Sequence, residues 1–178
     1  DAQTLGGAHL NVTVSASSVT SDINFGNRQS LDWGDAPDSY GTLVTSNGPR
    51  HGIVTGYGLT LTPTSGVNVV DGETNGQPSP NATGDDNSPP LSPTDENGVL
   101  FLSGLTPGAS GTARVGVRTA GFSSGVLQAW VDFNRDGDFL DPNEQIIRDR
   151  SLGTGIHNLQ FTVPAGAQLG TTFARFRY

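Results

Sequence analysis

The sequence predicts an all-β fold, an antiparallel β-sandwich of the jelly-roll or immunoglobulin-like kind with long acidic loops and little or no helix. Apolar and polar residues alternate in several segments, as in strands with one buried and one solvated face. The 25 glycines and 11 prolines indicate short strands joined by many turns. A chain of 178 residues can build one sizeable core with a small extension, but not two full domains.

Residues 126–133 show the strand pattern most clearly, because Leu127, Ala129, Val131 and Phe133 fall on one face. The same alternation occurs in 9–16, 112–119 and 157–164. Further candidate strands are 19–25, 57–62, 98–102 and 171–177. Eight or so such strands, separated by Gly and Pro turns, favour a sandwich.

One helix signal interrupts this pattern. Asp141 stands where a helix N-cap would be, Pro142 follows at the first helical position, and Glu144 is placed to complete a capping box. The run ends by Gly153, so we expect at most a short helix here.

Composition narrows the classes of function. The net charge of −8 and pI near 4.5 argue against binding nucleic acid or an anionic membrane surface, and favour cations as partners. No apolar run approaches the roughly 18 residues that direct membrane insertion requires. Cysteine is absent and all nine basic residues are arginines, which excludes disulfides, thiolate chemistry and cross-links through lysine.

The segment 130–146 follows the clearest predicted strand and is rich in Asp and Glu. Asp132, Asn134 and Asp136 alternate before Gly137, as in the first half of an EF-hand calcium loop, and hard oxygen ligands of this kind suit Ca²⁺. The predicted calcium ligands are Asp132, Asn134, Asp136, Asp138 and Glu144, with Asp141 as a possible addition. The closing Glu belongs at loop position 12 but stands at position 13. The alternative is a solvated hairpin turn whose Glu144 caps a short helix.

Magnesium fits this flexible loop less well, because it prefers strict octahedral geometry and retains waters. Zinc would need nearby His or Cys, and the loop has neither.

A second acidic group lies in the long Pro-rich stretch between Val70 and Val99. Such a stretch inside a compact domain is functional, held by an ion, or disordered. A possible second metal site comprises Asp71, Glu73, Asp85, Asp86, Asp95 and Glu96, and a solvated loop is the alternative. Three further acids, Asp32, Asp35 and Asp38, either supply ligands or form turns around Gly34 and Pro37.

Two aromatic residues are candidates for stacking on a sugar ring beside the ion, Trp130 and Tyr57. Trp33 is expected to be a packing anchor instead. The three histidines (His9, His51 and His157) are scattered and do not suggest a catalytic set. Because no nucleophile elbow, phosphate loop or HExxH motif occurs, we expect that the protein is not an enzyme.

Several ordered motifs together resemble the GEVED domain, a module of large secreted and surface-anchored bacterial proteins. They are LDWGDAPDSYGT (31–42), RHGI (50–53), GLTL (58–61), VDGETNGQPSPNATGDD (70–86), DENGV (95–99), AWVDFNRDGDF (129–139) and FTVPAGAQLGTTFARFRY (161–178). The resemblance implies an extracellular, adhesin-like β-sandwich without a known catalytic role, over residues 31–178. The family pattern also carries its loop glutamate in the displaced place of Glu144.

In that family the strand matching 171–178 is followed by a Gly-Glu-Val-Glu-Asp segment, so the domain is expected to lack its final strand. Residues 1–30 resemble the closing strands of a Ser-Asp-repeat protein B-type domain, whose ending here reads INFGN, residues 23–27.

The expected function is that of a calcium-stabilised structural or adhesive module, a stalk, spacer or matrix component on the cell surface or outside the cell. One alternative is a fibre subunit that polymerises by strand donation, with residues 10–25 of one copy pairing at the open edge near 173–178 of the next. A chain boundary placed at an exposed segment would explain the same ends. The other alternative is a calcium-dependent carbohydrate-binding module, and neighbouring domains are further possible partners.

Overall fold

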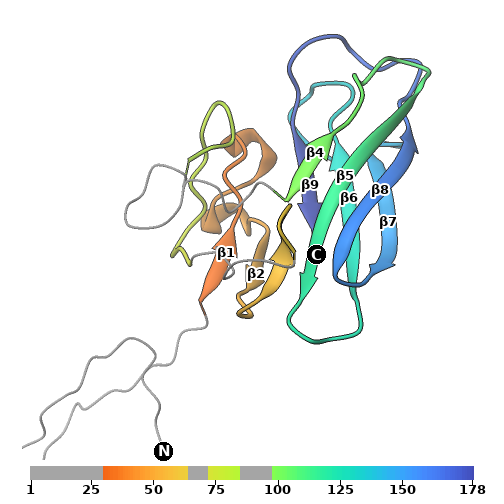
Figure 1. The fold of residues 1–178 in the computed structure, drawn as a ribbon. Coiled ribbons are helices and arrows are strands. Elements are labelled where there is room, and N and C mark those ends of the chain that lie inside the picture. Colours follow the sequence, from red (N-terminus) through yellow and green to blue (C-terminus); the bar gives the residue numbers. More distant parts are fainter. Residues whose placement is uncertain (1–29, 64–71, 85–97) are drawn as a thin grey trace, which may run out of the picture.

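A computed structural model describes residues 30–63, 72–84 and 98–178 (Figure 1). It shows a β-sandwich and a smaller lobe beside it, and the strands pair antiparallel. The predicted all-β sandwich is confirmed. The expected strands at 9–16 and 19–25, and nearly all of the N-terminal extension 1–30, lie outside the described residues.

The first sheet of the sandwich is built around the long strand β5 (Ser110–Thr119). Strand β8 (Gly155–Thr162) pairs with it along one side. On the other side two short strands follow one another, β3 (Tyr57–Leu59) opposite 117–119 and β4 (Val99–Phe101) opposite 113–115. Four strands therefore make a sheet only three strands wide.

Gly116 lies where β3 ends and β4 begins. Its carbonyl accepts from the Thr60 N–H at 2.9 Å, and its own N–H donates to the Gly98 carbonyl at 2.9 Å. A Cβ atom on Gly116 would lie 1.9 Å from the Thr60 carbonyl oxygen. Only glycine lets the two short strands meet at this point of β5.

The second sheet has β6 (Gly125–Val131) at its centre, between β7 (Gln145–Leu152) and β9 (Ala174–Arg177). The prediction of a short helix after Asp141 is therefore wrong, because the chain enters strand β7 directly. Register shifts interrupt the pairing of β6 with β7, and Asp149 has a left-handed φ of 45°. Ile147 and Leu152 are both buried although they stand five residues apart, because a bulge resets which face a side chain takes.

The core lies between the two sheets. Its buried apolar side chains are Ala113, Val115, Val117, Phe161 and Val163 from the first sheet side, and Leu127, Ala129, Val131, Phe133, Ile147 and Leu152 from the second. The alternation read from residues 112–119, 126–133 and 157–164 is confirmed by this burial. Complete burial of one such Val or Leu contributes roughly 1.5–3 kcal/mol, so these strands supply the main apolar stabilisation.

The lobe comprises residues 30–54 and 72–84. In it β1 (Leu31–Trp33) pairs with β2 (Arg50–Gly52), and two short 3-10 turns follow β1, η1 (Asp38–Tyr40) and η2 (Val44–Ser46). Residues 72–84 are tied on by hydrogen bonds, from Glu73 N–H to the Leu31 carbonyl and from Ser79 N–H to the Asp35 carbonyl, both 2.9 Å. Polar contacts, more than apolar ones, hold this part together.

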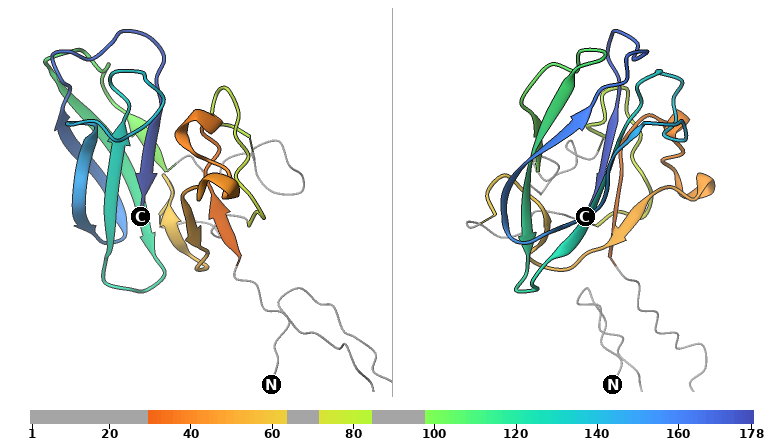
Figure 2. Two further views of the ribbon diagram at one scale, coloured as in Figure 1. Left: turned by 180° about the vertical axis from the view of Figure 1, so that it is seen from behind. Right: turned by 90° about the vertical axis from the view of Figure 1, so that its right-hand side faces the viewer.

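The lobe lies beside the edge of the sandwich where β3, β4 and β9 run (Figure 2). Tyr40 joins the two parts, because its hydroxyl donates to Asp132 at 2.6 Å and its carbonyl accepts from the Arg175 guanidinium at 3.2 Å. Among the described residues, no helix has the length and apolar character needed to cross a membrane.

Candidate metal centre

The acidic loop, residues 132–144, connects β6 to β7. Its two ends are joined where Val131 N–H donates to the Glu144 carbonyl at 2.9 Å. Gly137 has a φ of 93°, a left-handed conformation that glycine adopts at no steric cost. The chain therefore turns sharply at Gly137, between Asp136 and Asp138.

Three carboxylates meet at the tip of this loop. Asp136, Asp138 and Asp141 each place an oxygen within 4.8 Å of the others, an arrangement that could hold a metal ion. The side-chain amide of Asn134 donates to Asp136 at 2.9 Å and to Asp141 at 2.7 Å. The hydrogen bond from Asn134 holds the pKa of Asp136 below its ordinary value, so this carboxylate is ionised at neutral pH.

Asp132 lies beneath the tip and is fully buried. Its carboxylate accepts hydrogen bonds from the backbone N–H groups of Arg135 and Gly137, and from the Tyr40 hydroxyl. Its backbone N–H donates to the Phe173 carbonyl at 3.1 Å. Asp132 therefore joins the loop to the lobe and to the segment that leads into β9.

Tyr40 is the partner of Asp132 that the sequence did not reveal. Burial, together with the hydrogen bond to Asp132, raises the pKa of the Tyr40 hydroxyl well above its usual range. The hydroxyl therefore stays protonated and acts as a donor. Because the two residues stand 92 positions apart, no local pattern could pair them.

Glu144 closes the loop from the β7 side and is only 2% exposed. One carboxylate oxygen accepts from Phe133 N–H at 3.0 Å, and the other accepts from Asp141 N–H at 3.3 Å. The second contact is the reciprocal bond of a capping box, made here without a helix. Burial raises the pKa of Glu144, and the nearby charge of Asp132 contributes to the shift.

The donor set suits a hard cation. The predicted ligands, five carboxylates and the Asn134 amide, offer oxygen atoms together with the loop carbonyls, and Ca²⁺ takes such ligands in irregular geometry. The cationic side chain within the loop does not neutralise them, because Arg135 donates instead to the carbonyls of Leu169 at 3.0 Å and Thr171 at 2.9 Å. A cation at the tip would offset the repulsion among the acids.

The structure divides the predicted ligands into two groups. Asp136 and Asp141, both exposed, and the half-buried Asp138 form the cluster at the tip, where Asn134 bridges Asp136 and Asp141. Asp132 and Glu144 lie buried and accept hydrogen bonds from backbone N–H groups. Asp141, expected only as a possible addition, is a full member of the cluster. Glu144 is turned into the loop despite standing one place late in the motif.

Only one member of the second acidic group can be placed. Glu73 forms an isolated bridge with Leu31 and accepts from Trp33 N–H at 3.0 Å, so it fastens residues 72–84 to β1. The other predicted ligands lie outside the described residues: Asp71, Asp85, Asp86, Asp95 and Glu96.

The acids spaced along 32–38 have different surroundings. Asp35 is buried and accepts a hydrogen bond from Gly84 N–H at 2.8 Å, which joins the two segments of the lobe. Asp38 is exposed in η1, and Asp32 lies on β1 opposite His51. The structure thus gives Asp35 a structural role.

The two aromatic candidates lie at opposite ends of β6. Trp130 is half-buried and precedes the acidic loop, whereas a Cβ on Gly125 would meet the Tyr57 hydroxyl at 1.8 Å. Five residues of strand separate these points by roughly 17 Å. Tyr57 stacks on Tyr178, with ring centroids 5.0 Å apart, away from the acidic loop. A sugar site beside the ion would therefore have to rely on Trp130.

Residues 126–178 match the family model of the GEVED domain. The match covers β6, the acidic loop, β7, β8 and β9, and supports the resemblance read from the sequence. The resemblance of residues 1–30 to a Ser-Asp-repeat B-type domain is not confirmed. No curated protein and no solved structure matches the chain.

Proposed function

We propose that this chain is a calcium-stabilised, non-catalytic structural module of a secreted or cell-surface protein, serving as a stalk, spacer or adhesive matrix component. The acidic loop is the observation that carries the proposal, because three of its carboxylates converge at one tip. The GEVED match is compatible with an extracellular structural module. Calcium is the cation that fits an irregular set of hard oxygen donors.

The contacts of the acidic loop support a structural role for the ion. Asp132 is hydrogen-bonded to Tyr40 of the lobe and to Phe173, which leads into β9, while Glu144 directly precedes β7. A cation that orders the loop would therefore fix the lobe and two strands of the second sheet at once. Ligands that bind only the folded state stabilise it, by about 2.7 kcal/mol at a concentration 100 times the dissociation constant.

Thermal melts of the whole chain test this proposal. For a protein of this size, 2.7 kcal/mol corresponds to a rise of roughly 5–10 °C in Tm, which we expect with saturating Ca²⁺ relative to chelator. Magnesium should give a smaller rise. The double variant Asp136→Asn/Asp138→Asn should lose the calcium response.

Asp149→Asn is the matched control, because Asp149 is an exposed acid on β7 that accepts from the Gln128 amide, and asparagine keeps that acceptor oxygen. It should keep the full calcium response. An unchanged Tm of the parent chain across calcium and chelator would exclude a stabilising role for the ion.

Strand donation is a second candidate function. Within the described residues β9 pairs with β6 alone, and an unpaired strand edge can accept a strand from another copy. Such assembly predicts concentration-dependent oligomers or fibres by size-exclusion chromatography and electron microscopy. A monomer at all concentrations would dismiss this candidate while leaving the calcium proposal intact.

A further inference from the structure

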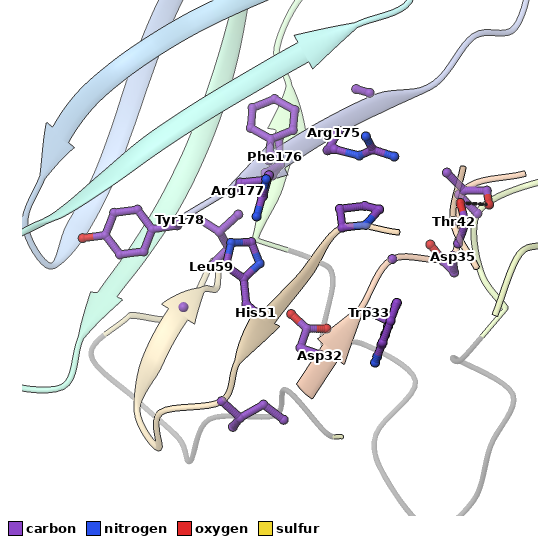
Figure 3. A pocket seen from close by; sticks show the side chains of 18 of the residues that line it. Asp32, Trp33, Asp35, Thr42, His51, Leu59, Arg175, Phe176, Arg177 and Tyr178 are labelled. Atoms are coloured by element: carbon purple, nitrogen blue, oxygen red, sulfur yellow. Dashed lines mark hydrogen bonds between the residues drawn. The ribbon is translucent and has the colours of Figure 1, made fainter. Parts of the chain in front are cut away.

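A pocket of about 390 Å³ lies between the lobe and the sandwich (Figure 3). One wall is formed by β1 and β2, and the other by β3, β4 and β9. Much of the lining is apolar, including Ile53, Leu59, Val99 and Phe101. A volume of this size suits a small organic molecule or a few side chains of a larger one.

Two arginines of β9 give the sandwich wall its charge. Phe176 packs against the core, so the alternation of a strand turns Arg175 and Arg177 to the opposite face. Figure 3 shows the Arg177 side chain reaching toward the His51 ring, while Arg175 turns away along β9. Arg175 is engaged, since it donates to the Tyr40 carbonyl and its guanidinium lies 4.7 Å from the centre of the Phe139 ring.

Arg177 has fewer of its hydrogen-bond donors paired than Arg175. Its Nε atom is buried and has no hydrogen-bond partner among the residues that the structure describes. A buried donor without an acceptor costs about 1–3 kcal/mol, and more when the group is charged. A bound ligand that supplies a hydrogen-bond acceptor to this Nε would remove this cost.

The charge of Arg177 affects the pKa of two neighbouring groups. Burial and the nearby Arg177 charge lower the pKa of both His51 and Arg175. The lowered pKa leaves His51 neutral at neutral pH, so the guanidinium groups carry the positive charge of this wall. Asp35 also lines the pocket, but it accepts from Gly84 N–H. Asp32 lines the pocket as well, on β1 opposite His51.

The geometry points to a binding site for a carboxylate with an apolar body, in which Arg177 is the principal partner and the apolar lining contacts the rest of the ligand. A guanidinium presents paired N–H donors that match the two oxygens of a carboxylate. His51, beside Arg177, offers a further ring nitrogen. The carboxylate belongs either to a free organic acid or to an acidic side chain of an extended polypeptide.

Titrations followed by ¹H–¹⁵N NMR test this site on the whole chain. The free-acid probe is 3-methylbutanoate, with 3-methylbutanamide as its uncharged match. The polypeptide probe is acetyl-Thr-Glu-Thr-Glu-Thr-amide, whose acids have the same spacing as Arg175 and Arg177, with the Gln-for-Glu peptide as its match. We expect saturable shifts at the amides of β9 and His51 with at least one acid, and at least tenfold weaker binding of its uncharged match.

Arg177→Gln should weaken acid binding at least tenfold, and Arg177→Lys should restore only part of it because lysine lacks the paired donors. Arg148→Gln, which changes an exposed arginine of β7, should bind as the parent does. A response to 3-methylbutanoate alone identifies a small-molecule site, and a response to the peptide alone identifies an acidic strand as the ligand.

Equal binding of acid and uncharged match, or no saturable response to either acid, would overturn the assignment. These two outcomes are read on the parent chain, so they decide the question even if Arg177→Gln fails to fold. The titrations are run both with Ca²⁺ and with chelator, so that binding at this pocket is read separately from ion binding at the acidic loop.

Discussion

In the sandwich, β5 and β6 are ten and seven residues long and bury Val115, Val117 and Leu127 completely, whereas β1 and β2 of the lobe are three residues each. Trp33 is the buried apolar residue of the described lobe, and its other buried side chains include Asp35 and Thr42. Thr42 donates to the Ala36 carbonyl at 2.7 Å. The sandwich is held mainly by apolar burial, and the lobe mainly by hydrogen bonds.

This difference teaches how the two regions depend on each other. A net hydrogen bond contributes only about 0.5–1.5 kcal/mol, so a lobe with one buried apolar anchor has little stability of its own. The lobe is stabilised by its contact with the sandwich, in which the Tyr40 hydroxyl donates to Asp132 in the acidic loop. We therefore expect a destabilising substitution in the core to lower the stability of both regions, and one in the lobe to increase local opening of the lobe alone.

The largest expected effect comes from Leu127→Ala. Removing a fully buried leucine side chain should lower the free energy of unfolding by about 3 kcal/mol, through lost burial and the cavity left behind. Urea denaturation measures this loss. Leu100→Ala, at a position 48% exposed on β4, should change it by less than about 0.5 kcal/mol. Equal losses in the two variants would contradict the placement of the core.

A smaller and more local effect is expected from Trp33→Ala. The change removes the apolar anchor of the lobe and the stacking of Arg50, whose guanidinium lies 5.1 Å from the ring centre. Hydrogen exchange should accelerate at least about tenfold in β1 and β2 but stay unchanged in β5 and β6, because local opening leaves the core intact. Val44→Ala, at an exposed lobe position, is the control. Equal acceleration in β6 would show that the two regions unfold together.

The smallest effect is the alkaline pH dependence of the sandwich. Burial raises the pKa of Tyr178 from 10 to about 12, and its hydroxyl donates to the Leu152 carbonyl at 2.6 Å. Between these values the unfolded chain releases a proton that the folded chain keeps, so stability should fall as pH rises from 10 to 12. Urea midpoints at pH 9, 10 and 11 measure the slope. Tyr178→Phe should make it shallower, and an unchanged slope would show that Tyr178 does not carry the effect.

The predictability of a strand from the sequence depended on its regularity. Alternation in 112–119, 126–133 and 157–164 gave the correct buried faces, because a regular strand turns every second side chain to one side. In β7 the bulge around Asp149 breaks this period, and the local capping pattern suggested a helix instead. Pairing with β6 overrode that local preference, which a sequence pattern cannot register.

The sequence by itself determined the sandwich faces and the gathering of acids in the loop, because period-two burial and a 13-residue turn are local properties. Only the tertiary structure decided that Tyr40 bonds Asp132, that Glu73 fastens residues 72–84 to β1, and that Arg177 faces a pocket beside His51. Each of these joins segments remote in the chain. These contacts depend on how the lobe packs against the edge of the sandwich, which residue spacing in the sequence cannot predict.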